Sequence, residues 1–168
     1  MRHLACYHNP DRMGYASGKV TRFSVATSKP VEALRGQRVW SISGDAQPRA
    51  YHLDATWVVD QVGHARWKEF ANFARASEAN GYRFRPPIHL NPLPWFRGFL
   101  KSQSNFSLGL QSIERKYAAK LDALWMAQRG QAPDTSQHPD DLGSPEKYRE
   151  GGTLRVMVNT YERDLKAR

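Results

Sequence analysis

Apolar and polar side chains alternate along several short stretches in the first part of the chain, and this pattern predicts β-strands. Positions 2–8 and 21–26 each fit a short strand, and positions 38–43 lead through Gly44-Asp45 into a longer stretch over 51–62. The apolar positions of the long stretch fall on one face because side chains alternate across a strand. They are Leu53, Ala55, Trp57 and Val59. We expect these side chains to face a core.

Helical spacing of apolar residues predicts three helical segments. The first is a turn over 29–34 that Ser28 caps, the second covers 65–79, and the third covers 112–128. The stripe of the second helix comprises Trp67, Phe70, Phe73 and Ala74. The stripe of the third comprises Ile113, Tyr117, Leu121, Leu124 and Trp125.

Two further stretches are expected to be extended. Positions 83–90 contain Pro86 and Pro87, which have no backbone N–H and therefore belong at a sheet edge or in a crossing segment. Positions 106–110 fit a final strand. Together these elements predict a mixed α/β domain over residues 1–128.

The composition changes after this domain. Residues 129–147 are rich in Pro and Asp and poor in apolar side chains, which is typical of a linker because little surface can be buried. Residues 148–168 become amphipathic again toward their end and predict a C-terminal helix, which we interpret as the start of a further domain.

The net charge of +9 is confined to the predicted domain. Residues 1–125 hold 18 Lys and Arg against nine Asp and Glu, whereas residues 126–168 hold seven of each. A positive surface attracts polyanions, and nucleic acid is the partner that this charge favours. A membrane surface or an acidic protein remains an alternative on charge alone.

Several classes of chemistry find no support in the sequence. There is no Gly-rich phosphate loop, no nucleophilic Ser motif and no pair of His at metal-binding spacing. The lone Cys6 excludes an internal disulfide and a Cys-rich zinc site. We expect no cofactor, no metal and no catalysis by this chain alone. No stretch fits a signal peptide or a membrane span, so we expect a cytoplasmic protein.

Polar and aromatic residues at strand ends and in loops are the candidates for binding a base. Such side chains stack on a base or bond to its edge, and the first and last strands of a barrel are neighbours, which would bring the two groups together. One group is Tyr7, His8 and Asn9; the other is Ser104, Asn105 and Phe106. Trp40 and Trp57 are further candidates as a pocket wall. The alternatives are that the loop residues cap turns and that both Trp lie in the core.

Three stretches resemble a known family. GQRVWSISG, the strand that ends in VVDQV, and the later segment PPIHLNPLPWF are similar to the PUA-like β-barrels, in particular their EVE-type branch. The resemblance covers residues 1–125 in order. It implies a small PUA-like barrel with flanking helices that reads nucleic acid, and several branches hold a modified base in an aromatic pocket.

A second resemblance lies in YREGGTLRVMVNTYERDLKAR, residues 148–168. This segment is similar to the one that leads into the HNH nuclease domain of modification-dependent restriction endonucleases. The resemblance implies a reader of modified double-stranded DNA that flips a base and targets a linked nuclease, through which the protein could form a homodimer. The metal-binding residues of that nuclease are absent here. The alternatives are an RNA-binding PUA-like module and a protein-interaction domain whose basic patch is incidental.

Overall fold

The computed structural model describes residues 1–15, 22–64 and 70–131. These residues belong to one compact unit, Met1–Ala132. The described residues end at 131. Most of the predicted linker, residues 132–147, and the whole 148–168 segment therefore lie outside them. None of the described helices is long and apolar enough to cross a membrane.

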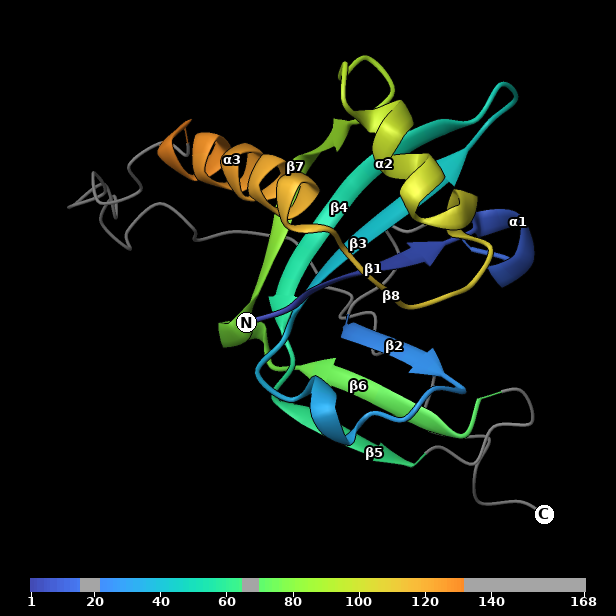
Figure 1. The fold of residues 1–168 in the computed structure, drawn as a ribbon, viewed down its shortest axis with the longest axis vertical. Helices are drawn as coiled ribbons and strands as arrows, with labels where there is room; N and C mark the ends of the chain where they lie inside the picture. Colours follow the sequence, from blue (N-terminus) through green and yellow to red (C-terminus); the bar gives the residue numbers. More distant parts are fainter. Residues whose placement is uncertain (16–21, 65–69, 132–168) are drawn as a thin grey trace, which may run out of the picture. The chain divides into compact units, whose positions relative to one another are not determined.

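This unit has the mixed α/β fold that the sequence predicts, and its strands form two sheets (Figure 1). The larger sheet has the order β7 (Gly81–His89), β4 (Ala50–Val58), β3 (Arg38–Asp45), β1 (His3–His8) and β8 (Gln111–Ser112). Strands β1 and β3 run parallel, and the other neighbours are antiparallel. The smaller sheet has the order β2 (Phe23–Thr27), β6 (Asn72–Ala76) and β5 (Gln61–His64).

Helices and short 3-10 turns complete the unit. The α-helices are α1 (Pro10–Met13), α2 (Phe96–Ser102) and α3 (Arg115–Gln131). The 3-10 turns are η2 (Glu32–Leu34), η3 (Glu78–Asn80) and η4 (Ser104–Phe106). The third predicted helix is confirmed by α3. The turn near position 30 is confirmed by η2, but it begins after Val31 and no side chain caps it, so the cap at Ser28 is wrong.

Two hydrophobic cores lie on opposite faces of the larger sheet. Ala5 belongs to the core that includes residues of α2 and α3, whereas its neighbour Leu4 belongs to the core shared with the smaller sheet. This division follows from the alternation of side chains along β1. The four apolar positions predicted to share one face of the 51–62 stretch are all buried, but the single face is wrong. Leu53 belongs to the first core and Ala55, Trp57 and Val59 belong to the second, because the register shifts at a bulge between Leu53 and Ala55.

The larger sheet does not close on itself. Its edges are β7 and β8, and among the described residues no strand pairing joins these edges or links the two sheets. The expected closed barrel is therefore not formed by the part of the chain that the structure describes. The edge position of β7 confirms the role predicted for Pro86 and Pro87, which need no ladder partner there.

The long strand predicted over 51–62 is divided between the two sheets. Strand β4 ends at Val58, and β5 begins at Gln61 in the smaller sheet. Asp60 lies at the crossing, where its Oδ2 accepts hydrogen bonds from the backbone N–H and the hydroxyl of Ser77 and from the amide of Asn80. These bonds hold the start of β5 against η3.

The helix predicted over 65–79 is wrong. Residues 72–76 form β6, which pairs with β2 on one side and β5 on the other. Hydrogen bonds on both edges outweigh a helical apolar pattern, because they satisfy every backbone group of a short segment. Ala74 is buried in the core between the sheets, and Trp67 lies outside the described residues.

The final strand predicted over 106–110 is also wrong. Pairing with β1 starts only at Gln111, and residues 104–106 form the turn η4. Ser104, Asn105 and Phe106 all have positive φ, at 48°, 51° and 59°. A left-handed turn cannot continue a strand, so the extended segment is displaced toward the C-terminus.

Candidate nucleic-acid interface

The carboxyl end of β1 is where the first group of predicted site residues lies. Strand β1 ends at His8, and the side chain of Asn9 accepts a hydrogen bond of 3.0 Å from the backbone N–H of Asp11. Asn9 is thus the N-cap of α1. Figure 1 shows α1, α2 and the β3–β4 hairpin on the same side of the unit as this strand end.

Tyr7 and Phe106, one from each predicted group, are in contact. Their rings are stacked with centroids 5.0 Å apart and planes 8° apart. Tyr51 lies against both rings, at 6.0 Å from Tyr7 and 5.9 Å from Phe106. Phe106 is buried, and Tyr7 and Tyr51 are half-buried. The structure therefore brings the two loops together, but the rings fill the space between them and leave no slot for a base.

The phenol of Tyr7 is fixed by polar groups at the hairpin. Arg49 donates a hydrogen bond of 2.8 Å from Nη1 to Tyr7 Oη, and its guanidinium lies 3.5 Å from Asp11. Burial raises the pKa of Tyr7, although the hydrogen bond from Arg49 acts in the opposite direction. A Cβ on Gly44 would lie 2.6 Å from Tyr7 Oη. The glycine therefore makes room for the tyrosine tip.

His8 does not share a wall with Tyr7. Adjacent residues of a strand point to opposite faces, so Tyr7 packs on the side of α2 while His8 lies on the other side. The His8 Nε2 is 2.8 Å from the carbonyl of Tyr15, and the two rings are 5.0 Å apart. The sequence group Tyr7–Asn9 is thus split into a half-buried aromatic, an imidazole on the opposite face of the strand and a helix cap.

Ser104 and Asn105 are presented by a loop that other residues hold in place. Both side chains are exposed, and the residue before them, Gln103, is only 1% exposed. Gln103 donates from Nε2 to the carbonyl of Ser112 at 3.2 Å, and its own carbonyl accepts from Gln111 Nε2. Positive φ costs about 1–3 kcal/mol for a residue other than glycine. The hydrogen bonds of Gln103 must therefore offset the backbone strain of residues 104–106.

Trp40 and Trp57 lie in the two cores. Trp40 is 0% exposed and donates its indole N–H to His3 Nδ1 at 3.1 Å. Trp57 is 1% exposed and donates to the hydroxyl of Ser41 at 3.0 Å. Both satisfy their polar atom inside the unit. The structure supports the core interpretation, and neither ring is open to a base.

Exposed cations lie on α1, on α2 and on the edge strand β7, and none of them is among the predicted site residues. Residues 79–113 contain four Arg and Lys and no Asp or Glu, and this acid-free run is the sequence signal that identifies them. Arg85, Arg97 and Lys101 from this run are exposed, as is Arg12 of α1. Arg12, Arg85, Arg97 and Lys101 form no ion pair within the described part of the chain.

Helix α2 connects these cations to the aromatic cluster. Phe96 lies 5.3 Å from the Tyr51 ring, and Phe99 lies 6.0 Å from the Phe106 ring. The buried side of α2 therefore supports the rings, while Arg97 and Lys101 project from its exposed side. A polyanion that contacts α2 would lie close to Tyr7, Arg49 and the η4 loop.

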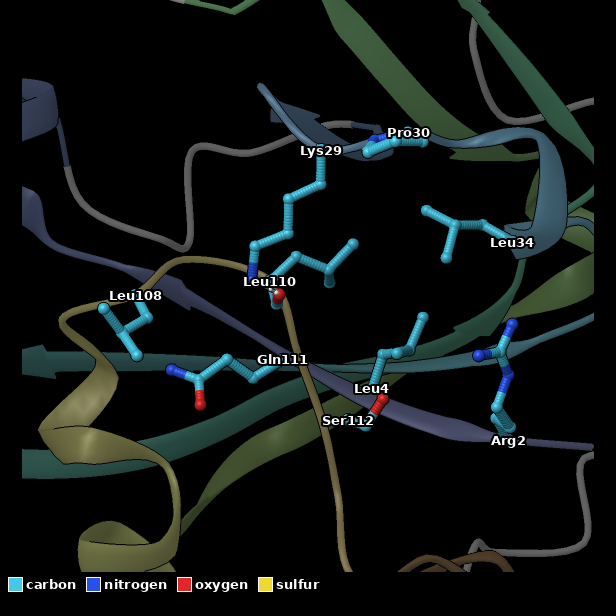
Figure 2. A pocket seen from close by; sticks show the side chains of 9 residues that line it. All are labelled: Arg2, Leu4, Lys29, Pro30, Leu34, Leu108, Leu110, Gln111 and Ser112. Atoms are coloured by element: carbon cyan, nitrogen blue, oxygen red, sulfur yellow. Dashed lines mark hydrogen bonds between the residues drawn. The ribbon is translucent and has the colours of Figure 1, made fainter.

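Two cavities lie elsewhere in the unit. Figure 2 shows a cavity of about 340 Å³ lined by Arg2, Leu4, Lys29, Pro30, Leu34, Leu108, Leu110, Gln111 and Ser112. The second, of about 530 Å³, lies beside the first half of α3 and includes Arg2, His3 and Asp122. Neither contains any of the eight predicted residues. Lys29 in the first already donates to the carbonyl of Leu110 at 2.5 Å, which reduces its availability to a ligand.

The described residues contain no group of three or more His, Cys, Asp or Glu that could hold a metal ion. Burial raises the pKa of the Cys6 thiol to about 11, even though a contact with Ser41 at 3.3 Å acts the other way. A thiol must lose its proton to act as nucleophile or ligand, so the position of Cys6 favours neither role.

No protein-family model, curated protein or solved structure matches the chain.

Proposed function

We propose that this chain is a DNA-binding reader module whose interface is the end of the larger sheet formed by α1, α2 and the β3–β4 hairpin. The supporting observation is the group of exposed cations on α1 and α2, namely Arg12, Arg97 and Lys101, which form no ion pair among the described residues. Guanidinium and ammonium groups bind phosphates without regard to sequence and supply most of the non-specific affinity.

The resemblances noted in the sequence supply the rest of the proposal. A PUA-like reader receives one base extruded from the duplex, and a modified group on this base compensates for the unstacking, which costs a few kcal/mol. Here the base would be received at Tyr7, Phe106 and Tyr51. Since these rings pack against one another, entry of a base requires the η4 loop to move outward with Phe106.

The linker and the 148–168 segment would connect this reader to a nuclease domain. A linked HNH nuclease would act close to the modified base, because tethering raises its effective concentration on the bound DNA. In this arrangement the chain itself binds and does not cut, and the cutting domain would also be the means by which the protein forms a homodimer.

Equilibrium binding of the full chain to labelled duplex DNA tests the proposal. Affinity should fall steeply with salt, with a log–log slope of roughly −0.9 for each phosphate neutralised. Replacing Arg97 and Lys101 with Gln should weaken modified and unmodified DNA alike and reduce the slope by about 2 in total. Arg35→Gln is a matched control, because Arg35 is exposed just before β3 begins, at the end of that strand opposite the hairpin.

The outcomes are distinct. Absence of binding at low salt, or affinity that does not change with salt, would remove the nucleic-acid proposal. Equal effects of Arg35→Gln and Arg97→Gln would show that the positive surface acts as a whole and that the interface is not at α2. Tighter binding of single-stranded RNA than of modified duplex DNA would favour an RNA-binding module instead.

A further inference from the structure

Four residues from four strands form a single row across the larger sheet. His8 of β1 pairs with Ser43 of β3, Ser43 pairs with His52 of β4, and His52 pairs with His89 of β7. Because directly paired residues point to the same face, three imidazoles and a hydroxyl share one side of the sheet. We call these four residues the imidazole row. Their positions in the sequence give no indication that they meet.

The contacts within the row confirm this placement. The rings of His52 and His89 are stacked, with centroids 5.2 Å apart and planes 26° apart. Asp45 Oδ1 lies 3.8 Å from His52 Nδ1. Ser43 is buried at the middle of the row, the His52 side chain is 29% exposed, and His89 is exposed. A ligand can therefore reach the His52–His89 end of the row from solvent.

The row lies at the same end of the sheet as the proposed interface, on the face opposite α2. His8 is separated from α1 by Asn9, and His52 follows the β3–β4 hairpin that carries Arg49. The charged residues nearest the row are Asp11 and Arg12 after β1, Asp45 and Arg49 at the hairpin, Asp54 on β4 and Arg85 on β7, while Arg38 of β3 and Arg83 of β7 lie toward the other end of the sheet. Three of the six nearer residues are cations, and Asp45 lies 3.8 Å from His52 Nδ1.

The stacked pair has an electrostatic property that suits an anion. Histidine is the side chain whose charge changes between pH 5 and 8. Two cationic rings stacked at 5.2 Å, beside the carboxylate of Asp45, would attract an anion more strongly than two neutral rings. A phosphate group placed against both rings would therefore bind the cationic pair more tightly than the neutral pair. Binding of such a group is therefore coupled to the uptake of a proton.

We propose that the His52–His89 end of the imidazole row is a phosphodiester-binding site, which makes the affinity of this module for nucleic acid increase as the pH falls. This inference rests on the proposed function and adds to it a defined contact and a regulation by pH. Asp45 lies on the Nδ1 side of His52, at 3.8 Å, which leaves the Nε2–H of the ring for the ligand.

The experiment measures the affinity of the full chain for one labelled duplex between about pH 6 and about pH 8, the range in which histidine titrates, at constant ionic strength. For each proton taken up, the dissociation constant should fall by up to about tenfold per pH unit as the pH decreases. His52→Gln with His89→Gln should lose most of this dependence. Gln keeps a hydrogen-bond donor but cannot be protonated in this range.

The chain offers a matched control in His64. This residue is exposed on β5 of the smaller sheet, where its Nδ1 lies 2.8 Å from Asn72 Oδ1. His64→Gln should bind DNA with the pH dependence of the unaltered chain. Thermal unfolding of each variant at both ends of the pH range separates an effect on binding from an effect on folding.

The possible results separate this inference from the proposed function. Binding that is independent of pH, or a dependence that survives in the His52 and His89 double variant, would overturn the phosphate site while the reader function stands. A double variant that changes the ratio between modified and unmodified DNA but not the pH dependence would also overturn it, because the row would then read the base. Absence of binding at every pH would remove the proposed function itself.

Discussion

The ring of Tyr7 stacks on the ring of Phe106 at 5.0 Å, and this contact ties the end of the first strand to the loop that precedes the last. The pairing of β1 with β8 brings the two loops side by side. Since Phe106 also lies against Phe99 of α2, the contact joins the sheet, the loop and the helix. Substitutions at this point should therefore affect both stability and binding.

Phe106→Ala is expected to lower the free energy of unfolding by ~3–5 kcal/mol, because it removes a buried aromatic ring from between Tyr7 and α2. Urea denaturation measures this loss. Leu108→Ala is the control, since Leu108 is 60% exposed and its replacement should change stability little. Equal losses in the two variants would mean that the ring stack contributes nothing specific.

A linked pair of substitutions tests the close approach of the hairpin to Tyr7. Gly44→Ala should destabilise the unit by ~1–3 kcal/mol, because the new Cβ would lie 2.6 Å from Tyr7 Oη. Tyr7→Phe removes that oxygen, so Gly44→Ala should cost less in the Tyr7→Phe background. A double-mutant cycle on melting temperatures measures the coupling, and additive effects would show that Oη is not the atom that Gly44 accommodates.

The left-handed η4 turn predicts an unusual response to glycine. Ser104 has a φ of 48°, which a residue with a Cβ adopts at a cost and glycine adopts freely. Ser104→Gly should therefore keep or raise the melting temperature, whereas Ser104→Val should lower it by the equivalent of ~1–2 kcal/mol. If both variants melt alike, the positive φ is not a feature of the folded protein in solution.

The Cys6 thiol predicts a dependence of stability on alkaline pH. Its pKa in the folded protein, about 11, lies above the ordinary value of 9.0 because of burial. The folded state thus holds this proton more tightly than the unfolded state, and the resulting stability is present below pH 9.0 and is lost as the pH rises toward 11. Chemical denaturation across this range measures it, with Cys6→Ala as the reference.

Alkylation gives an independent readout of the same group. The folded chain should react slowly with a thiol reagent near neutral pH, and the denatured chain should react fast, because only the thiolate is nucleophilic. A stability curve for Cys6→Ala with the same alkaline slope, or fast labelling of the folded chain, would contradict the raised pKa of the Cys6 thiol.

Much of the framework could be predicted locally. Alternating apolar residues identified β1, β3 and β4, and the helical stripe around Leu121 identified α3. The pair Pro86 and Pro87 placed β7 at an edge. Such signals work because they depend on backbone chemistry or on burial of one face, which are properties of the segment itself.

The failures concern segments whose state depends on partners. The apolar pattern of residues 72–76 predicts a helix, but hydrogen bonds to β2 and β5 on both sides make this segment a strand. The predicted 51–62 strand passes from one sheet to the other where Asp60 binds Ser77 and Asn80. No short-range pattern contains those partners, because they are distant in sequence.

The site shows the same division. The sequence by itself determined the residue types, the positive charge of residues 1–125 and, through alternation along β1, the opposite faces of Tyr7 and His8. Only the tertiary structure decided that Trp40 and Trp57 lie in the cores and which partners the two faces meet, Phe106 for Tyr7 and the row with His52 for His8. The physical reason is that the face of a residue follows from its own strand, whereas its neighbours across the sheet follow from register.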